Sequence, residues 1–90
     1  MDNVEAKRER GNLLIVDDDL STRQTLEGLL TGEGYEVRCA PNGKMAMMFV
    51  REEPPELILL DVRMPDMDGF EVCRRFKEDP QTAGIPVIFI

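Results

Sequence analysis

The sequence predicts an α/β fold in which helices cover a parallel β-sheet. Residues 13–16 and 57–60 are short aliphatic runs, which are typical of strands that are buried on both faces. Segments with a helical spacing of apolar residues separate the predicted strands, and the connections are short. This alternation of strand and helix favours a parallel sheet with right-handed crossovers.

The chain opens with a charged segment, residues 1–12, that shows no apolar periodicity. We interpret this segment as a disordered leader and residues 13–90 as the domain. Ninety residues suffice for one domain at most, near the lower limit for a self-sufficient core. The first strand of that domain is predicted at residues 13–16.

A helix is predicted after the first strand. Leu26, Leu29 and Leu30 follow the i, i+3, i+4 spacing of an apolar helix face. Asp19 and Ser21 both have side chains that can cap its N-terminus, and the sequence leaves the choice open.

Residues 35–40 alternate polar and apolar side chains and predict an outer strand. A turn is predicted at residues 41–43, where proline, asparagine and glycine follow one another. A second helix is predicted over residues 45–50. Its inward face consists of Ala46, Phe49 and Val50.

The central strand, residues 57–60, is followed by turn-forming residues and then by a third helix. Phe70, Cys73 and Phe76 mark the face of this helix that packs on the sheet, and Pro80 follows its end. A last strand is predicted at residues 87–90.

The two cysteines, Cys39 and Cys73, lie far apart in a chain that contains no histidine. Zinc sites need clustered cysteine or histidine ligands, so this pattern excludes one. We interpret both cysteines as reduced thiols in the core. The absence of histidine also excludes a histidine-based nucleophile or triad within the chain.

The charge balance is acidic, with 11 basic and 18 acidic residues and a net charge of −7. This balance argues against direct binding of nucleic acid, which depends on lysine and arginine to neutralise phosphates. The sequence contains neither an apolar run of membrane-spanning length nor a signal-peptide pattern. We therefore expect a cytoplasmic protein with no membrane partner.

Acidic residues end two of the predicted strands: Asp17 and Asp18 follow the first, and Asp61 follows the central one. Neighbouring strands lie about 4.8 Å apart, and parallel strands end at the same edge of the sheet. The three carboxylates are therefore expected to converge where α/β sheets bind ligands. Clustered carboxylates suit a hard divalent ion such as Mg²⁺, beside which an aspartate can act as a nucleophile.

Three motifs together resemble the receiver domain of two-component response regulators. They are LLIVDDD at residues 13–19, the asparagine-glycine pair with alanine in NGKMA at 42–46, and LILLDVRMPDMDGF at 57–70. The resemblance extends over residues 13–90. It implies a flavodoxin-like, doubly wound parallel sheet of strand order 2-1-3-4, truncated before a fifth strand.

The resemblance also implies a role for each residue of the acidic cluster. By position, Asp61 is the phosphoacceptor. Asp17, Asp18 and Asp61 hold Mg²⁺ or Mn²⁺, together with the backbone carbonyl of Arg63. The phosphoryl donor is a phosphohistidine on a partner histidine kinase or histidine phosphotransfer protein. Such a domain is a signalling phosphoacceptor that catalyses only its own phosphorylation and dephosphorylation, and is not otherwise an enzyme.

The sequence departs from the family pattern at its C-terminal end. The family places a serine or threonine after strand four and a lysine after strand five, and residues 1–90 contain neither position. We therefore expect a fragment that is defective in switching. The uncharged segment at residues 87–90 is then an edge strand, and we expect the fragment to self-associate.

Two other functions fit parts of the sequence. DDDLS at residues 17–21 matches the opening motif of haloacid-dehalogenase phosphatases, in which Asp17 is the nucleophile. That match leaves the motif around Asp61 unexplained. A receiver scaffold can also serve as an interaction module without being phosphorylated, because fold does not determine function.

Overall fold

The computed structural model describes residues 10–90 and contains four parallel strands and three helices in that part of the chain. The strands pair in the order β2-β1-β3-β4, which confirms the predicted order 2-1-3-4. Their bounds are β1 Asn12–Val16, β2 Glu36–Ala40, β3 Leu57–Leu60 and β4 Val87–Phe89. Residues 1–9 of the predicted leader lie outside the described residues, and the first strand begins one residue earlier than predicted.

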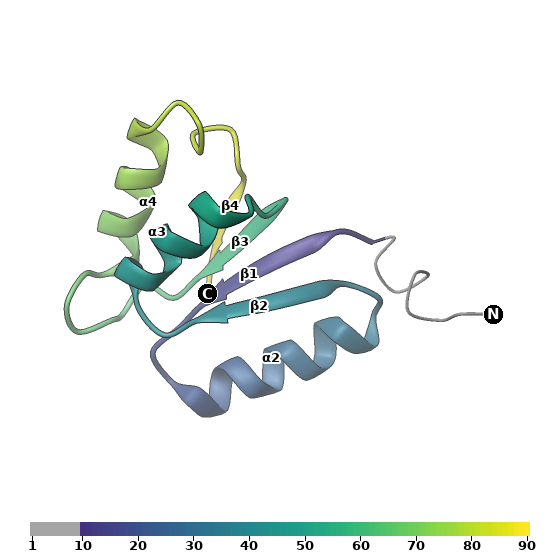
Figure 1. The fold of residues 1–90 in the computed structure, drawn as a ribbon. Coiled ribbons are helices and arrows are strands. Elements are labelled where there is room, and N and C mark those ends of the chain that lie inside the picture. Colours follow the sequence, from purple (N-terminus) through teal and green to yellow (C-terminus); the bar gives the residue numbers. More distant parts are fainter. Residues whose placement is uncertain (1–9) are drawn as a thin grey trace.

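Three helices connect the strands and lie on both faces of the sheet (Figure 1). Helix α2, Leu20–Gly32, packs over β1 and β2 on one face. Helices α3, Gly43–Glu52, and α4, Gly69–Glu78, lie on the other face and contact each other. Within residues 10–90, no helix is long and apolar enough to cross a membrane.

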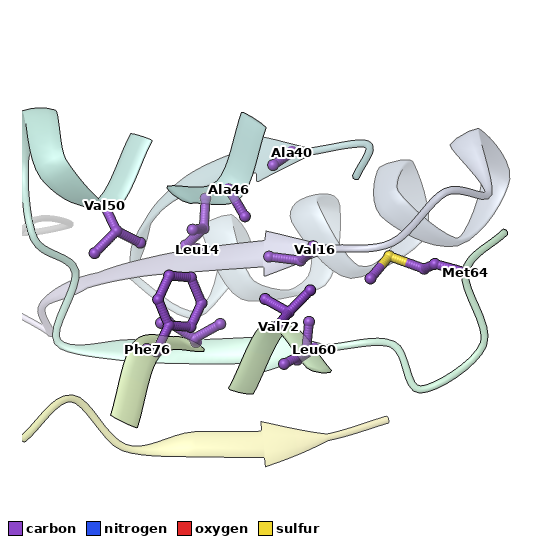
Figure 2. Packing of buried hydrophobic residues seen from close by; sticks show 10 residues of the cluster. Leu14, Val16, Ala40, Ala46, Val50, Leu60, Met64, Val72 and Phe76 are labelled. Carbon is purple, nitrogen blue, oxygen red and sulfur yellow. The ribbon is translucent and has the colours of Figure 1, made fainter. Parts of the chain in front are cut away.

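The main hydrophobic core lies between the sheet and helices α3 and α4 (Figure 2). Alternate residues of a strand point to opposite faces, so every second residue of β1 and β3 enters this core. Burial of each leucine, isoleucine or valine contributes about 1.5–3 kcal/mol. The buried members are Leu14, Val16, Ala40, Ala46, Val50, Ile58, Leu60, Met64, Val72 and Phe76.

The opposite face of the sheet is covered over only part of its width. Leu13 and Ile15 of β1 are buried on this side. Leu57 and Leu59 of β3 are only half-buried, and Ile88 of β4 is 50% exposed. Burial therefore decreases from β1 toward β4, in keeping with the position of α2 over β1 and β2.

Each helix begins with a side chain that caps its backbone N–H groups. Asp19 caps α2 by accepting from Thr22 N–H over 3.1 Å, which resolves the choice between Asp19 and Ser21. Asn42 caps α3 over 2.8 Å, and Asp68 caps α4 over 2.9 Å. The predicted turn at residues 41–43 is therefore wrong at its last residue, which is already helical. The helix N-termini, with their positive dipole ends, lie at the edge where β1, β2 and β3 end.

The inward face of α4 differs from the predicted one. Phe70, predicted to face the sheet, is 60% exposed and contacts Phe89 of β4 with ring centroids 5.0 Å apart. Val72 is buried in its place, and Phe76 is buried as predicted. Gly69 lies against the Asp61 backbone, and Val72 and Phe76 follow it at helical spacing on the same buried face.

Both cysteines are free thiols and only partly buried. Cys73 packs against the main core, as predicted. Cys39 is not part of that core, because its thiol lies 3.8 Å from the Glu27 carboxylate of α2 on the other side of the sheet. Burial and the Glu27 charge raise the pKa of the Cys39 thiol, which keeps it protonated and unreactive.

Candidate functional site

Two aspartates follow neighbouring strands at one edge of the sheet. Asp17 comes directly after β1, and Asp61 comes directly after β3. Val16 pairs with Leu60 at the ends of these strands, and the Asp61 N–H donates to the Val16 carbonyl over 2.8 Å. The strand register therefore places the two carboxylates side by side.

Asp18 joins them to complete an acidic cluster. Carboxylate oxygens of Asp17, Asp18 and Asp61 all lie within 4.8 Å of one another. Asp17 is 5% exposed, Asp61 is half-buried and Asp18 is exposed. The three side chains that the sequence indicated as a site thus lie together, with access from solvent on the side of Asp18.

Asp17 is held by hydrogen bonds from several parts of the chain. Its backbone N–H donates to the Ala40 carbonyl at the end of β2 over 3.1 Å. The Arg23 guanidinium of α2 donates to the Asp17 carbonyl over 2.7 Å. The Asp17 carboxylate accepts from the Asp19 N–H over 2.9 Å. The first two contacts fix the Asp17 backbone, and the third holds its carboxylate. The Arg23 contact was not found from the sequence.

The electrostatics of the cluster favour a cation. Burial is the main cause that raises the pKa of Asp17, and the neighbouring carboxylates Asp61 and Asp18 add to it. The hydrogen bond from the Asp19 N–H opposes this rise. Burial of a charge among like charges is unfavourable unless an opposite charge compensates it.

We expect Asp17→Asn to raise the melting temperature of the metal-free protein at neutral pH. The amide oxygen can still accept from the Asp19 N–H, while the disfavoured buried charge is removed. A gain of about 1 kcal/mol corresponds to a rise of about 4–8 °C for a domain of this size. Thermal unfolding in the presence of a chelator measures it.

The difference in stability between Asp17→Asn and the natural protein should depend on pH. Because the pKa of Asp17 is raised in the folded state, its stabilising contribution is present below its unfolded pKa and is lost as the pH rises through the folded value. The advantage of Asp17→Asn should therefore increase from acid toward neutral pH. A variant that is no more stable than the natural protein at neutral pH would contradict this account.

Asp61 is fixed by the loop that follows it. Its carboxylate accepts from the Arg63 N–H over 3.2 Å through one oxygen, Oδ1. Within residues 10–90, no N–H or hydroxyl group donates to the other oxygen, which lies beside the Asp17 carboxylate. That oxygen remains available to a ligand. The role that the family resemblance assigns to the Arg63 carbonyl stays a prediction.

Gly69 closes the same loop against Asp61. The Gly69 N–H donates to the Val62 carbonyl over 2.9 Å. A Cβ atom on Gly69 would lie 2.3 Å from the Asp61 carbonyl oxygen and 2.9 Å from the Val62 Cα. Only glycine permits this approach, so the start of α4 is packed directly on the backbone of the candidate nucleophile. The sequence marks Gly69 as a turn residue, but this contact is visible only in three dimensions.

Two open grooves lie on the described surface, and one of them includes Asp17 of the acidic cluster. One has a volume of about 390 Å³ and is lined by Asp17, residues of the first half of α2, and Ile90. The other has a volume of about 270 Å³ and lies between the β2–α3 and β3–α4 loops. Its lining residues are Asn42, Gly43, Lys44, Asp66 and Met67. The cluster is thus at an accessible edge of the molecule.

The donor set of the cluster fits a hard divalent cation. All three side chains offer carboxylate oxygens, the ligands that Mg²⁺ and Mn²⁺ prefer. A bound cation would also offset the repulsion that raises the pKa of Asp17.

Comparison with known proteins identifies the family of this chain. A family model described as the response regulator receiver domain matches residues 13–90. The response regulator PleD of Caulobacter vibrioides is 49% identical over 78 residues, which are 87% of this chain and 17% of PleD. The DNA-binding response regulator MtrA of Mycolicibacterium paratuberculosis is 38% identical over 81 residues, or 90% of this chain and 35% of MtrA. The chain thus spans less than two thirds of the length of these relatives.

Solved structures agree with this match. The N-terminal domain of a response regulator receiver protein from Methanoculleus marisnigri superposes with a TM-score of 0.86 and 35% identity, covering 88% of this chain and 64% of that one. The chemotaxis protein CheY4 of Vibrio cholerae gives a TM-score of 0.83 and 33% identity, covering 87% and 65%. The fold is therefore the receiver-like flavodoxin fold that the sequence predicted. Residues 13–90 belong to the response regulator receiver domain family of two-component signalling.

Proposed function

We propose that this chain accepts a phosphoryl group on Asp61 from a phosphohistidine, with Mg²⁺ or Mn²⁺ bound at the acidic cluster. The observation that supports this proposal is the convergence of Asp17, Asp18 and Asp61 within 4.8 Å. The family match supports it independently, because receiver domains are generally signalling phosphoacceptors.

The surroundings of the three carboxylates favour Asp61 as the nucleophile. Asp17 is 5% exposed and its carboxylate accepts from the Asp19 N–H, so its oxygens are poorly accessible to a donor. Asp18 lies at the exposed side of the cluster, where its carboxylate is free to contact a cation. Asp61 is half-buried, and within residues 10–90 no N–H or hydroxyl group donates to one of its carboxylate oxygens. Its backbone is fixed by β3 and Gly69. This lowers the entropy cost of positioning the attacking oxygen.

The transfer requires one bond to form and one to break. The free carboxylate oxygen of Asp61 attacks the phosphorus atom, and the phosphorus–nitrogen bond to the donor imidazole breaks. The electron pair of that bond stays on the imidazole nitrogen, and Asp61 becomes an acyl phosphate. A cation held by Asp17, Asp18, Asp61 and the Arg63 carbonyl supplies positive charge to the phosphoryl oxygens.

The donor must come from a partner, because this chain contains no histidine. We assign that role to a histidine kinase or a histidine phosphotransfer protein in the cytoplasm, as the family implies. The family places a serine or threonine after strand four and a lysine after strand five, both in contact with the phosphoryl group, and residues 1–90 contain neither position. We therefore propose that this chain by itself is defective in switching.

The test is acyl phosphate mapping on the protein expressed from its complete gene. The protein is incubated with a small phosphodonor and Mg²⁺, reduced with borohydride, and digested for mass spectrometry. We expect reduction at Asp61 only, and complete loss of it in Asp61→Asn. Asp66→Asn is the matched control, because it neutralises an exposed aspartate of the same loop.

The other outcomes identify the rival functions. Modification of Asp17 would support the haloacid-dehalogenase interpretation. An unmodified, folded protein that still binds Mg²⁺ would support an interaction module that is not phosphorylated. Either result would overturn the proposal.

A further inference from the structure

Arg23, near the start of helix α2, reaches back to the residue that follows strand β1. Its guanidinium donates to the Asp17 carbonyl over 2.7 Å, and its side chain is half-buried. Hydrogen bonds from a charged donor are shorter and stronger than those between neutral groups. Within residues 10–90, Arg23 forms no ion pair with a carboxylate. Among the described residues, the Asp17 carbonyl is therefore the main partner of this guanidinium.

The Asp17 carbonyl belongs to the peptide group that joins the first two residues of the acidic cluster. A peptide group is planar, so a bond to its carbonyl fixes the direction in which the chain enters Asp18. The preceding peptide is held as well, because the Asp17 N–H donates to the Ala40 carbonyl over 3.1 Å. Arg23 and Ala40 thus hold the backbone on both sides of Asp17.

Asp18 depends on this backbone contact more than the other two carboxylates do. The side chains of Asp17 and Asp61 each accept a hydrogen bond from a backbone N–H group. Asp18 is exposed, and within residues 10–90 its carboxylate accepts no hydrogen bond. The position of Asp18 relative to the other carboxylates is therefore determined by the peptide group that Arg23 holds.

We propose that Arg23 is a positioning residue of the cation site, which acts through the Asp17 carbonyl to hold Asp18 where it can bind Mg²⁺. This inference rests on the metal site of the proposed function and adds a residue from outside the acidic cluster. Groups that orient metal ligands without touching the ion typically change metal affinity about 10–100-fold when they are replaced. Loss of the Arg23 hydrogen bond should therefore weaken Mg²⁺ binding about tenfold.

The charge of Arg23 and its hydrogen bond act on Mg²⁺ binding in opposite directions. A guanidinium near the cluster repels a cation, so removal of its charge alone should strengthen Mg²⁺ binding. Removal of the hydrogen bond releases the peptide between Asp17 and Asp18, which should weaken binding. Water and salt screen the repulsion, whereas the hydrogen bond is lost in full. Weaker binding by a variant that has become more negative would thus identify the positioning role.

Arg23→Met is the test variant, because methionine keeps an unbranched stem but has no hydrogen-bond donor. Isothermal titration calorimetry with Mg²⁺ alone measures the dissociation constants of the natural protein and the variant. We expect a dissociation constant about tenfold higher in Arg23→Met. Arg23→Lys keeps the charge and a donor but loses the planar geometry of the guanidinium, so its affinity should lie between the other two.

Arg38→Met is the matched control. Arg38 is also half-buried, and its guanidinium donates to the Phe49 carbonyl over 3.1 Å and to the Glu53 carbonyl. These carbonyls lie at the C-terminal end of α3, away from the acidic cluster. Both methionine variants lose one positive charge and a contact to the backbone, so a general loss of stability would appear in both. Arg38→Met should nevertheless bind Mg²⁺ with the natural affinity.

Unchanged or tighter Mg²⁺ binding by Arg23→Met, or an equal weakening in Arg38→Met, would overturn the proposal. If Arg23→Met did not fold, natural affinity in Arg23→Lys would overturn it instead. Acyl phosphate mapping separates this proposal from the proposed function. Phosphorylation of Asp61 in Arg23→Met should fall at low Mg²⁺ and recover when Mg²⁺ is in excess. The expected affinities without phosphorylation of any of these proteins would support the role of Arg23 and contradict the phosphoacceptor function, while a natural protein that binds no Mg²⁺ would overturn both.

Discussion

Gly69→Ala is expected to lower the free energy of unfolding by about 3 kcal/mol, the upper range for overpacking of a filled site. The added Cβ would lie 2.3 Å from the Asp61 carbonyl oxygen, and both contacting groups are backbone. A flexible side chain could rotate away, but here α4 or the end of β3 must move. For a domain of this size such a loss lowers the melting temperature by about 10 °C or more, which calorimetry or circular dichroism can measure.

Gly28→Ala is the matched control for this prediction. Gly28 lies within α2, and a Cβ atom there would meet no other atom within 4 Å. Alanine is the better helix former, so this change should stabilise the protein by up to about 1 kcal/mol. Opposite signs for the two glycine-to-alanine changes would separate close packing from helix propensity. A Gly69→Ala protein as stable as the natural one would show that the contact with Asp61 is not required.

Gly69→Ala should also slow the proposed phosphorylation of Asp61. Relief of the clash moves either α4, which begins beside Asp61, or the backbone of Asp61 and Val62 itself, and both changes alter the surroundings of the nucleophile. A displacement of about 1 Å at a nucleophile can reduce a reaction rate about a hundred-fold. The effect on acyl phosphate formation should therefore persist at a temperature where the variant is fully folded.

The overall fold could be predicted from the sequence because its signals are local. Residues 13–16 and 57–60 are aliphatic runs, and both became the central strands β1 and β3. Aspartate after each run indicated one shared edge of the sheet, and the strand register brought Asp17 and Asp61 together there. These features depend on strand geometry, which any parallel sheet shares.

The parts that could not be predicted depend on close contacts between elements. Gly69 of α4 lies against the Asp61 backbone, and this contact places Val72 on the buried face and leaves Phe70 exposed. Gly43, the first residue of α3, makes another close contact of this kind. A Cβ atom on Gly43 would lie 2.6 Å from Val72 Cγ2, so the helices approach closely at this glycine. Contacts between distant residues leave no periodic signal in the sequence.

Within the site, the sequence identified the acidic residues but not the groups that hold them. The Arg23 guanidinium donates to the Asp17 carbonyl, yet the sequence shows Arg23 only as a polar residue of a helix. Gly69 has no side chain, so its residue type does not reveal its contact with Asp61. Positioning contacts of this kind can be found only once the backbone is placed.

Addition of Mg²⁺ should raise the melting temperature of the protein by about 10 °C or more when the ion is at about 100 times its dissociation constant. Binding to the folded state alone contributes about 2.7 kcal/mol at that concentration, and a domain of this size gains about 4–8 °C for each kcal/mol. The stabilisation arises because the cation compensates the repulsion among Asp17, Asp18 and Asp61.

Asp18→Ala should abolish this response while leaving the metal-free protein folded. Asp18 is exposed, and within residues 10–90 its side chain makes no hydrogen bond or ion pair, so its loss removes a ligand and little else. Asp66→Ala is the control, because it removes the same charge from an exposed position outside the cluster and should keep the full response. Calorimetry of the three proteins with Mg²⁺ and with a chelator measures the difference. If Asp18→Ala and the natural protein responded equally to Mg²⁺, the ion would bind elsewhere, and the acidic cluster could not be the metal site.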